Sequence, residues 1–129
     1  MEKPLKRVIY FEDESDMVEL VRIILGREGY AVEGVPEGKV GLQAIKEELP
    51  DIILLDLMMP DMDGWEIFRQ IKKDEATTNI PVIVITAKAQ TVDKVLGLEI
   101  AKVDDYISKP FRPQELVERI EKVLSEREM

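Results

Sequence analysis

The sequence contains no cysteine and no histidine among its 129 residues. Without cysteine the chain forms neither a disulfide nor a thiolate metal site. Without histidine it has no imidazole ligand and no Ser-His or Cys-His catalytic pair. Any chemistry in this chain must therefore use carboxylates, hydroxyls and lysines.

Basic charge is also scarce, with 18 Lys and Arg residues against 27 Asp and Glu residues and a formal net charge of −9. Nucleic acids and anionic membranes bind basic surfaces, so we expect this chain to bind neither directly. No apolar run approaches the ~18 residues of a membrane span. Residues 1–4 lead directly into a predicted strand rather than a signal peptide, so we expect a cytoplasmic protein.

Five short apolar runs, each bounded by turn residues, predict strands. They cover residues 7–11, 31–35, 51–55, 82–85 and 105–107. Five amphipathic patterns alternate with these runs and predict helices. This alternation indicates a single α/β domain with a parallel sheet, because right-handed crossovers place helices on both faces.

Each predicted helix is marked by a start signal or an apolar stripe. The first begins at Ser15, the second has Pro36 in its first turn, and the last opens at Pro113. The stripe of the third contains Trp65, Phe68 and Ile71, and the stripe of the fourth contains Val92, Val95, Leu96 and Ile100.

Acidic residues follow two of the predicted strands. Asp56 ends the apolar run 52–55, and Glu12 and Asp13 follow the run 8–11. A carboxylate at the end of a buried strand is costly without a partner, and clustered carboxylates suggest a cation. The acids at 12–14 could instead be an ordinary helix start that interacts with the helix dipole.

A hydroxyl and an ammonium follow the last two strands, at Thr86 and Lys109. Each alone is commonly a plain surface residue. Together with the three carboxylates they would form a site for an anion and a divalent cation. An oxygen-only ligand set favours Mg²⁺, which prefers one or two carboxylates plus water and phosphate oxygens.

The ordered set of motifs resembles the receiver domain of two-component response regulators, of the CheY-like type. These motifs are Glu12-Asp13, Asp56, Met59-Pro60-Asp61-Met62-Asp63-Gly64, Thr86-Ala87 and Lys109-Pro110-Phe111. The resemblance covers essentially the whole chain. It implies a flavodoxin-like doubly wound (βα)5 fold with strand order 2-1-3-4-5, for which CheY itself is a standard example. It also implies one receiver domain over residues 1–129, with no output domain in this chain.

The resemblance implies a role for each matching residue. Asp56 would be the phosphoacceptor, taking a phosphoryl group from a sensor histidine kinase or phosphotransfer protein to give an acyl phosphate. Asp13, Asp56 and the backbone carbonyl of Met58 would hold Mg²⁺ directly, and Glu12 would act through a water. The chain would assist only its own phosphorylation and dephosphorylation, so it would not be a turnover enzyme.

The resemblance also implies a switch. Lys109 and the hydroxyl of Thr86 would contact the phosphoryl oxygens, whose charge must be neutralised during transfer. Thr86 would shift toward the phosphoryl group and Tyr106 would change rotamer, which alters the face made by the fourth helix, fifth strand and fifth helix. That face would bind a downstream protein or form a phosphorylation-dependent homodimer. The Lys109–Pro110 bond would be the family's cis peptide.

Three features of the sequence depart from the family's pattern. The usual pair of aspartates is replaced by Glu12 and an aspartate, which lengthens the arm that reaches the metal's water. The segment 98–106 is one residue longer than the common pattern and lacks its glycine. Met58 and Lys88 offer no carboxamide to place a hydrolytic water, so we expect slow self-dephosphorylation.

Three alternative functions compete with this one. A Mg²⁺-dependent aspartyl-phosphate phosphatase commonly has a second aspartate two residues after the nucleophile, where this chain has Met58. A flavodoxin-like electron carrier needs hydroxyl and glycine donors where residues 12–14 are acidic. An unphosphorylated receiver-like binding module remains an open alternative.

Overall fold

The computed structural model describes residues 5–87 and 103–127. Every predicted strand is present, and no strand boundary differs from its prediction by more than one residue. The elements in chain order are β1 (Lys6–Phe11), α1 (Ser15–Gly26), β2 (Tyr30–Val35), α2 (Gly38–Glu47), β3 (Ile52–Leu55), α3 (Gly64–Lys73), β4 (Val82–Thr86), β5 (Asp105–Ser108) and α6 (Pro113–Arg127).

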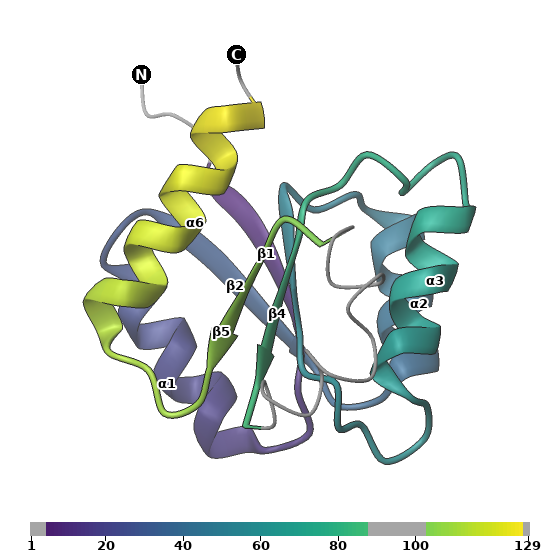
Figure 1. Cartoon of the computed structure of the whole chain (residues 1–129), viewed down its shortest axis with the longest axis horizontal. Coiled ribbons are helices and arrows are strands. Elements are labelled where there is room, and N and C mark those ends of the chain that lie inside the picture. The colour runs from purple at the N-terminus through teal and green to yellow at the C-terminus, as the bar shows by residue number, and fades with distance from the viewer. Residues whose placement is uncertain (1–4, 88–102, 128–129) are drawn as a thin grey trace.

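The five strands form one sheet in the order β2-β1-β3-β4-β5, and each neighbouring pair is parallel. This confirms the α/β class and the doubly wound order 2-1-3-4-5. Helices α1 and α6 lie on one side of the sheet, and α2 and α3 lie on the other (Figure 1). The carboxyl ends of all five strands therefore meet at one edge of the sheet.

Strand β3 shows why its sequence is apolar throughout. All four of its residues are buried, because helices cover both faces of the sheet. Successive side chains point to opposite faces. Ile53 and Leu55 accordingly join the core beneath α2 and α3, and Ile52 and Leu54 join the core beneath α1 and α6.

Helix α2 begins later than the sequence pattern indicates. We expected Pro36 in its first turn, but the helix begins at Gly38 and Glu37 keeps an extended backbone. The carboxylate of Asp61 accounts for this start, because it accepts hydrogen bonds from the amides of Gly38 at 2.7 Å and Lys39 at 3.2 Å. Amides in the first turn have no helical partner, so a side chain from a distant loop caps α2.

The predicted fourth helix, with Val92, Val95, Leu96 and Ile100, lies outside the described residues, as do Lys88 and the segment 98–102.

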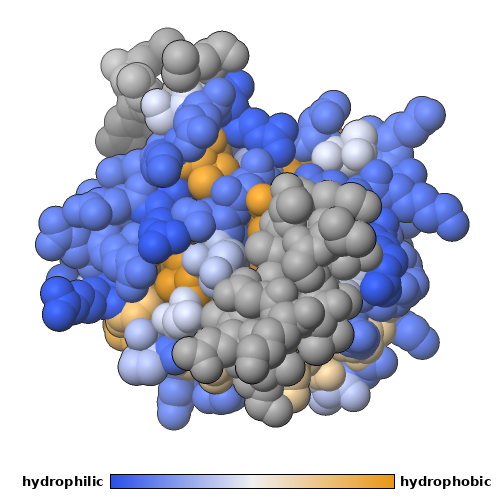
Figure 2. All heavy atoms as spheres, viewed as in Figure 1, coloured by the Kyte–Doolittle hydropathy of each residue, from blue (hydrophilic) through white to orange (hydrophobic). Residues whose placement is uncertain are grey.

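Among the described residues, no helix combines the length and the apolar character needed to cross a bilayer. The face shown in Figure 2 is mainly hydrophilic, and its apolar atoms form small separate patches.

Candidate functional site

Strand register brings together the acids that follow β1 and β3. Phe11 pairs with Leu55, the last residue of β3, and the amide of Asp56 donates to the Phe11 carbonyl at 3.0 Å. Glu12 and Asp56 therefore leave the sheet side by side. Both are buried, with 2% and 4% of their surface exposed. Two buried carboxylates need a positive partner to offset the loss of hydration.

Lys109 is that partner. It follows β5 directly, and its amide donates to the carbonyl of Thr86 at 3.0 Å. Its ammonium lies 2.5 Å from Oε1 of Glu12 and 2.6 Å from Oδ2 of Asp56. The peptide bond between Lys109 and Pro110 is cis. One ammonium thus joins the ends of three strands.

The two carboxylates keep Lys109 protonated. Burial acts to lower the pKa of the Lys109 ammonium, but its hydrogen bonds to Asp56 and Glu12, and their charges, outweigh burial and raise that pKa above its ordinary value. With one ammonium between two carboxylates, the group has more acidic than basic residues. It can therefore attract further positive charge.

Tyr10 is part of this group, although the sequence pattern did not identify it. Its hydroxyl donates to Oε1 of Glu12 at 3.0 Å, and its side chain is fully buried. Burial, and then the charge of Glu12, raise the pKa of the Tyr10 phenol. The signal that could have identified it is its position two residues before Glu12, because residues two apart on a strand share a face.

The loop after Asp56 is held by several backbone contacts. The amide of Met58 donates to Oδ1 of Asp56 at 2.9 Å, and Met58 forms an isolated bridge with Asp63. Asp63 also caps α3 by accepting from the amide of Trp65 at 2.9 Å. Gly64 begins α3 against the backbone of Leu57, where a Cβ would overlap main-chain atoms. These contacts fix the backbone of Met58 beside Asp56.

The other predicted site residues lie near this edge in different surroundings. Thr86 is fully buried at the end of β4, and Tyr106 of β5 is partly buried against the core beneath α2 and α3. Asp13 is exposed at the end of β1. In the part of the chain that the structure describes, no three acidic side chains are grouped closely enough to form a ready metal site. Of the predicted site residues, Glu12 and Asp56 are the two whose carboxylates contact the Lys109 ammonium.

A family model described as the response regulator receiver domain matches residues 8–121. This chain belongs to the response regulator receiver family. The DNA-binding response regulator MtrA of Mycobacterium tuberculosis is 40% identical over 120 residues, which are 93% of this chain and 51% of that protein. This receiver chain therefore spans about half the length of the curated relatives it matches.

Solved structures support the same assignment. A CheY-like response regulator receiver domain protein from Methanospirillum hungatei JF-1 is 33% identical, with a TM-score of 0.86 over 96% of this chain and 97% of that chain. The receiver domain of a sensor histidine kinase from Pseudomonas aeruginosa PAO1 is 27% identical, with a TM-score of 0.85 over 94% of this chain and 98% of that chain. That structure has a magnesium ion coordinated in its active site cleft.

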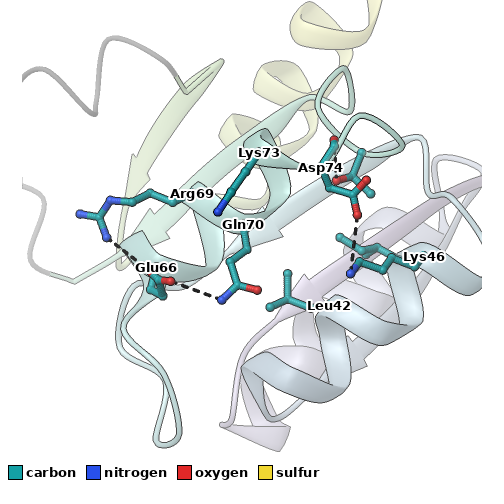
Figure 3. A pocket seen from close by; sticks show the side chains of 9 residues that line it. Leu42, Lys46, Glu66, Arg69, Gln70, Lys73 and Asp74 are labelled. Atoms are coloured by element: carbon teal, nitrogen blue, oxygen red, sulfur yellow. Dashed lines mark hydrogen bonds and ion pairs between the residues drawn. The ribbon is translucent and has the colours of Figure 1, made fainter.

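The receiver domain also has a groove between α2 and α3, with a volume of about 540 Å³ (Figure 3). It contains none of the predicted site residues. Its charged rim is largely paired, since Lys46 lies 3.6 Å from Asp74 and Arg69 lies 3.3 Å from Glu66. The groove therefore lacks a convergent set of polar groups, and the group around Asp56 is the stronger candidate for a functional site.

Proposed function

We propose that Asp56 is the phosphoacceptor of this receiver domain. One observation carries the proposal: Asp56 is buried beside Glu12 and holds the Lys109 ammonium at 2.6 Å. Its other oxygen accepts from the amide of Met58. A carboxylate fixed in this way is positioned as a nucleophile.

A carboxylate oxygen of Asp56 would form a bond to the phosphorus of a phosphohistidine on a sensor kinase or phosphotransfer protein. The P–N bond of the donor would break with its electron pair passing to the nitrogen, and the proton already on the other ring nitrogen would let the imidazole leave as a neutral group. Lys109 would neutralise charge on the phosphoryl oxygens, and the Thr86 hydroxyl would donate to one of them. The donor histidine must belong to another protein, because this chain has none.

The oxygen groups at this edge are of the kind that Mg²⁺ binds, although no three acidic side chains of the described residues are already grouped around one point. Asp13, Asp56 and the backbone carbonyl of Met58 would bind it directly, and Glu12 would bind one of its waters. Mg²⁺ needs only one or two carboxylates together with water and phosphate oxygens. That Glu12 and Asp56 already share one cation, the Lys109 ammonium, supports a second cation at this edge. When bound, Mg²⁺ would neutralise charge on the transferring group.

The donor would dock beside α1. Leu20 and Ile23 of α1 are 45% and 49% exposed and would contribute apolar contacts to such a partner. An apolar hollow of about 310 Å³ beside Lys109 is lined in part by Met17, Leu20 and Phe111. A protein that covers this surface would bring its histidine near Asp56.

The signal would leave through Tyr106. Tyr106 packs against the core beneath α2 and α3. The residue before it, Asp105, forms an ion pair with Arg119 of α6 at 2.8 Å, which connects this strand to α6. Phosphorylation would favour a second packing of Thr86 and Tyr106, to the extent that contacts differ between the two states. The altered face would bind a downstream protein or a second copy of the chain.

The proposal is tested by incubating the chain with Mg²⁺ and acetyl phosphate and measuring its intact mass. We expect an increase of one phosphoryl group in the wild type and none in Asp56→Asn. A mass increase that persists in Asp56→Asn would contradict the assignment. Continuous hydrolysis of a phosphomonoester by the wild type, abolished by the same substitution, would support the phosphatase alternative instead.

A further inference from the structure

Tyr10 reaches the site from inside the protein core. It lies in β1 two residues before Glu12, and its side chain lies on the face of the sheet covered by α1 and α6. Its ring is fully buried in that core, and its hydroxyl donates to Oε1 of Glu12 at 3.0 Å. Close packing leaves such a ring little freedom to move. The hydroxyl is therefore a fixed donor at the base of the site.

The donors around Glu12 are divided unequally between its two oxygens. Oε1 accepts from the Tyr10 hydroxyl and from the Lys109 ammonium. Oε2 accepts from the amide of Glu14 at 3.2 Å. A carboxylate oxygen accepts about two hydrogen bonds. The remaining acceptor capacity of Glu12 is therefore on Oε2.

A glutamate at this position needs such an anchor more than an aspartate does. It has one more rotatable bond, and ordering that bond costs conformational entropy. The Tyr10 phenol is a donor throughout the neutral range, because a tyrosine hydroxyl ionises only well above pH 7. Tyr10 and Lys109 together hold the longer arm in one orientation.

We propose that Tyr10 is a positioning residue for Glu12. Its hydroxyl fixes Oε1 toward Lys109 and leaves Oε2 to accept from a water bound to Mg²⁺. This inference rests on the proposed function, since it assigns Tyr10 a part in the same metal site. Tyr10 touches neither the phosphoryl group nor the metal, and it acts only through Glu12.

The test compares Tyr10→Phe with wild type, because this substitution removes only the hydroxyl. Mg²⁺ affinity is measured directly by titrating the fluorescence of Trp65, the only tryptophan in the chain. We expect the affinity for Mg²⁺ to fall about three- to tenfold. Removing a residue that orients a metal ligand typically lowers metal affinity by about tenfold or more, so this effect is at or below the low end of that range. The acetyl phosphate reaction should return to near the wild-type rate at saturating Mg²⁺. A merely structural defect would not be corrected in this way.

A double-mutant cycle assigns the effect to Glu12. In Glu12→Asp the shorter side chain loses contact with the hydroxyl, so adding Tyr10→Phe to that variant should change Mg²⁺ affinity less than twofold. Tyr30→Phe is the matched control, because Tyr30 is buried in the same core. It should leave Mg²⁺ affinity unchanged. If Tyr10→Phe costs as much affinity in the Glu12→Asp variant as it does in the wild type, the inference is overturned.

A measurement on the wild type makes the test independent of folding. The ring carbon that bears the Tyr10 hydroxyl should shift in its NMR spectrum when Mg²⁺ is added, and that of Tyr30 should not. If the wild type binds Mg²⁺ but the Tyr10 signal does not move and Tyr10→Phe binds normally, the inference is wrong and the proposed function stands. If the wild type neither binds Mg²⁺ nor accepts a phosphoryl group, the proposed function itself fails.

Discussion

The Lys109 ammonium lies 2.6 Å from the Asp56 carboxylate and joins the end of β5 to the end of β3. Only 14% of the Lys109 side chain and 6% of the Asp56 side chain are exposed, so this is not a surface ion pair. Removal of one partner would leave buried charge on the other. We therefore expect this pair to contribute to stability and, under the proposed function, to phosphoryl transfer.

Replacing Lys109 with methionine should destabilise the fold by about 3 kcal/mol at pH 7, because Glu12 and Asp56 lose their shared cation. Urea unfolding monitored by circular dichroism measures this change. Addition of Mg²⁺ should restore part of the stability by supplying another cation. Lys73→Met is the control, since Lys73 is exposed on α3, and we expect a change below about 0.5 kcal/mol. Equal unfolding midpoints for the two variants would contradict this reading.

The approach of α2 to β1 depends on Gly41. A Cβ on Gly41 would overlap the ring of Phe11, which is fully buried, whereas a Cβ on Gly26 would have no atom within 4 Å. Gly41→Ala should therefore cost about 1–3 kcal/mol through overpacking. Gly26→Ala should be neutral or slightly stabilising. Thermal unfolding of the two variants provides the comparison, and similar melting temperatures would refute the packing argument.

The Asp61 cap on α2 predicts a pH dependence. Its hydrogen bonds to the amides of Gly38 and Lys39 lower the Asp61 pKa, with the Gly38 contact the larger cause. The carboxylate therefore stabilises the fold above its ordinary pKa, and this contribution is lost as the pH falls through the lowered value. Asp61→Ala should lower the free energy of unfolding by about 0.5 kcal/mol at pH 7, a small value because the cap is exposed. At acid pH, where the carboxylate is protonated, the substitution should not change the free energy of unfolding. A pH-independent difference would show that the charge is not involved.

The side chain at position 58 leads us to expect a long lifetime for the phosphorylated form. The side chain of Met58 is 56% exposed beside Asp56 and has no group that could orient an attacking water. We expect the aspartyl phosphate to persist for minutes or longer, and Met58→Asn to shorten that lifetime severalfold. Release of inorganic phosphate from the purified phosphoprotein measures both rates. A half-life of seconds in the wild type would contradict the prediction.

The strands and the strand-end residues could be predicted because both follow from local patterns. Four apolar residues before Asp56 indicate a buried strand, and parallel pairing then brings Asp56 next to Glu12. The start of α2 could not be predicted, because its cap is Asp61, more than 20 residues away in sequence. A contact of that kind depends on how the completed fold places a loop.

Tyr10 was missed for a different reason. An aromatic residue in an apolar strand is most simply a core residue, and its ring does lie in the core. Only the structure shows that the hydroxyl ends 3.0 Å from Glu12. The sequence predicted that Lys109 shares this edge of the sheet with the carboxylates, but its simultaneous contact with two of them depends on side-chain geometry.

Locating the modified residue shows whether Asp56 accepts the phosphoryl group. The chain is phosphorylated with acetyl phosphate and Mg²⁺, reduced with borohydride and digested for peptide mass spectrometry. Borohydride converts an aspartyl phosphate into homoserine and leaves a free aspartate unchanged. We predict homoserine at position 56 and at no other aspartate. Homoserine at Asp13 or elsewhere, with Asp56 unmodified, would contradict the proposed function.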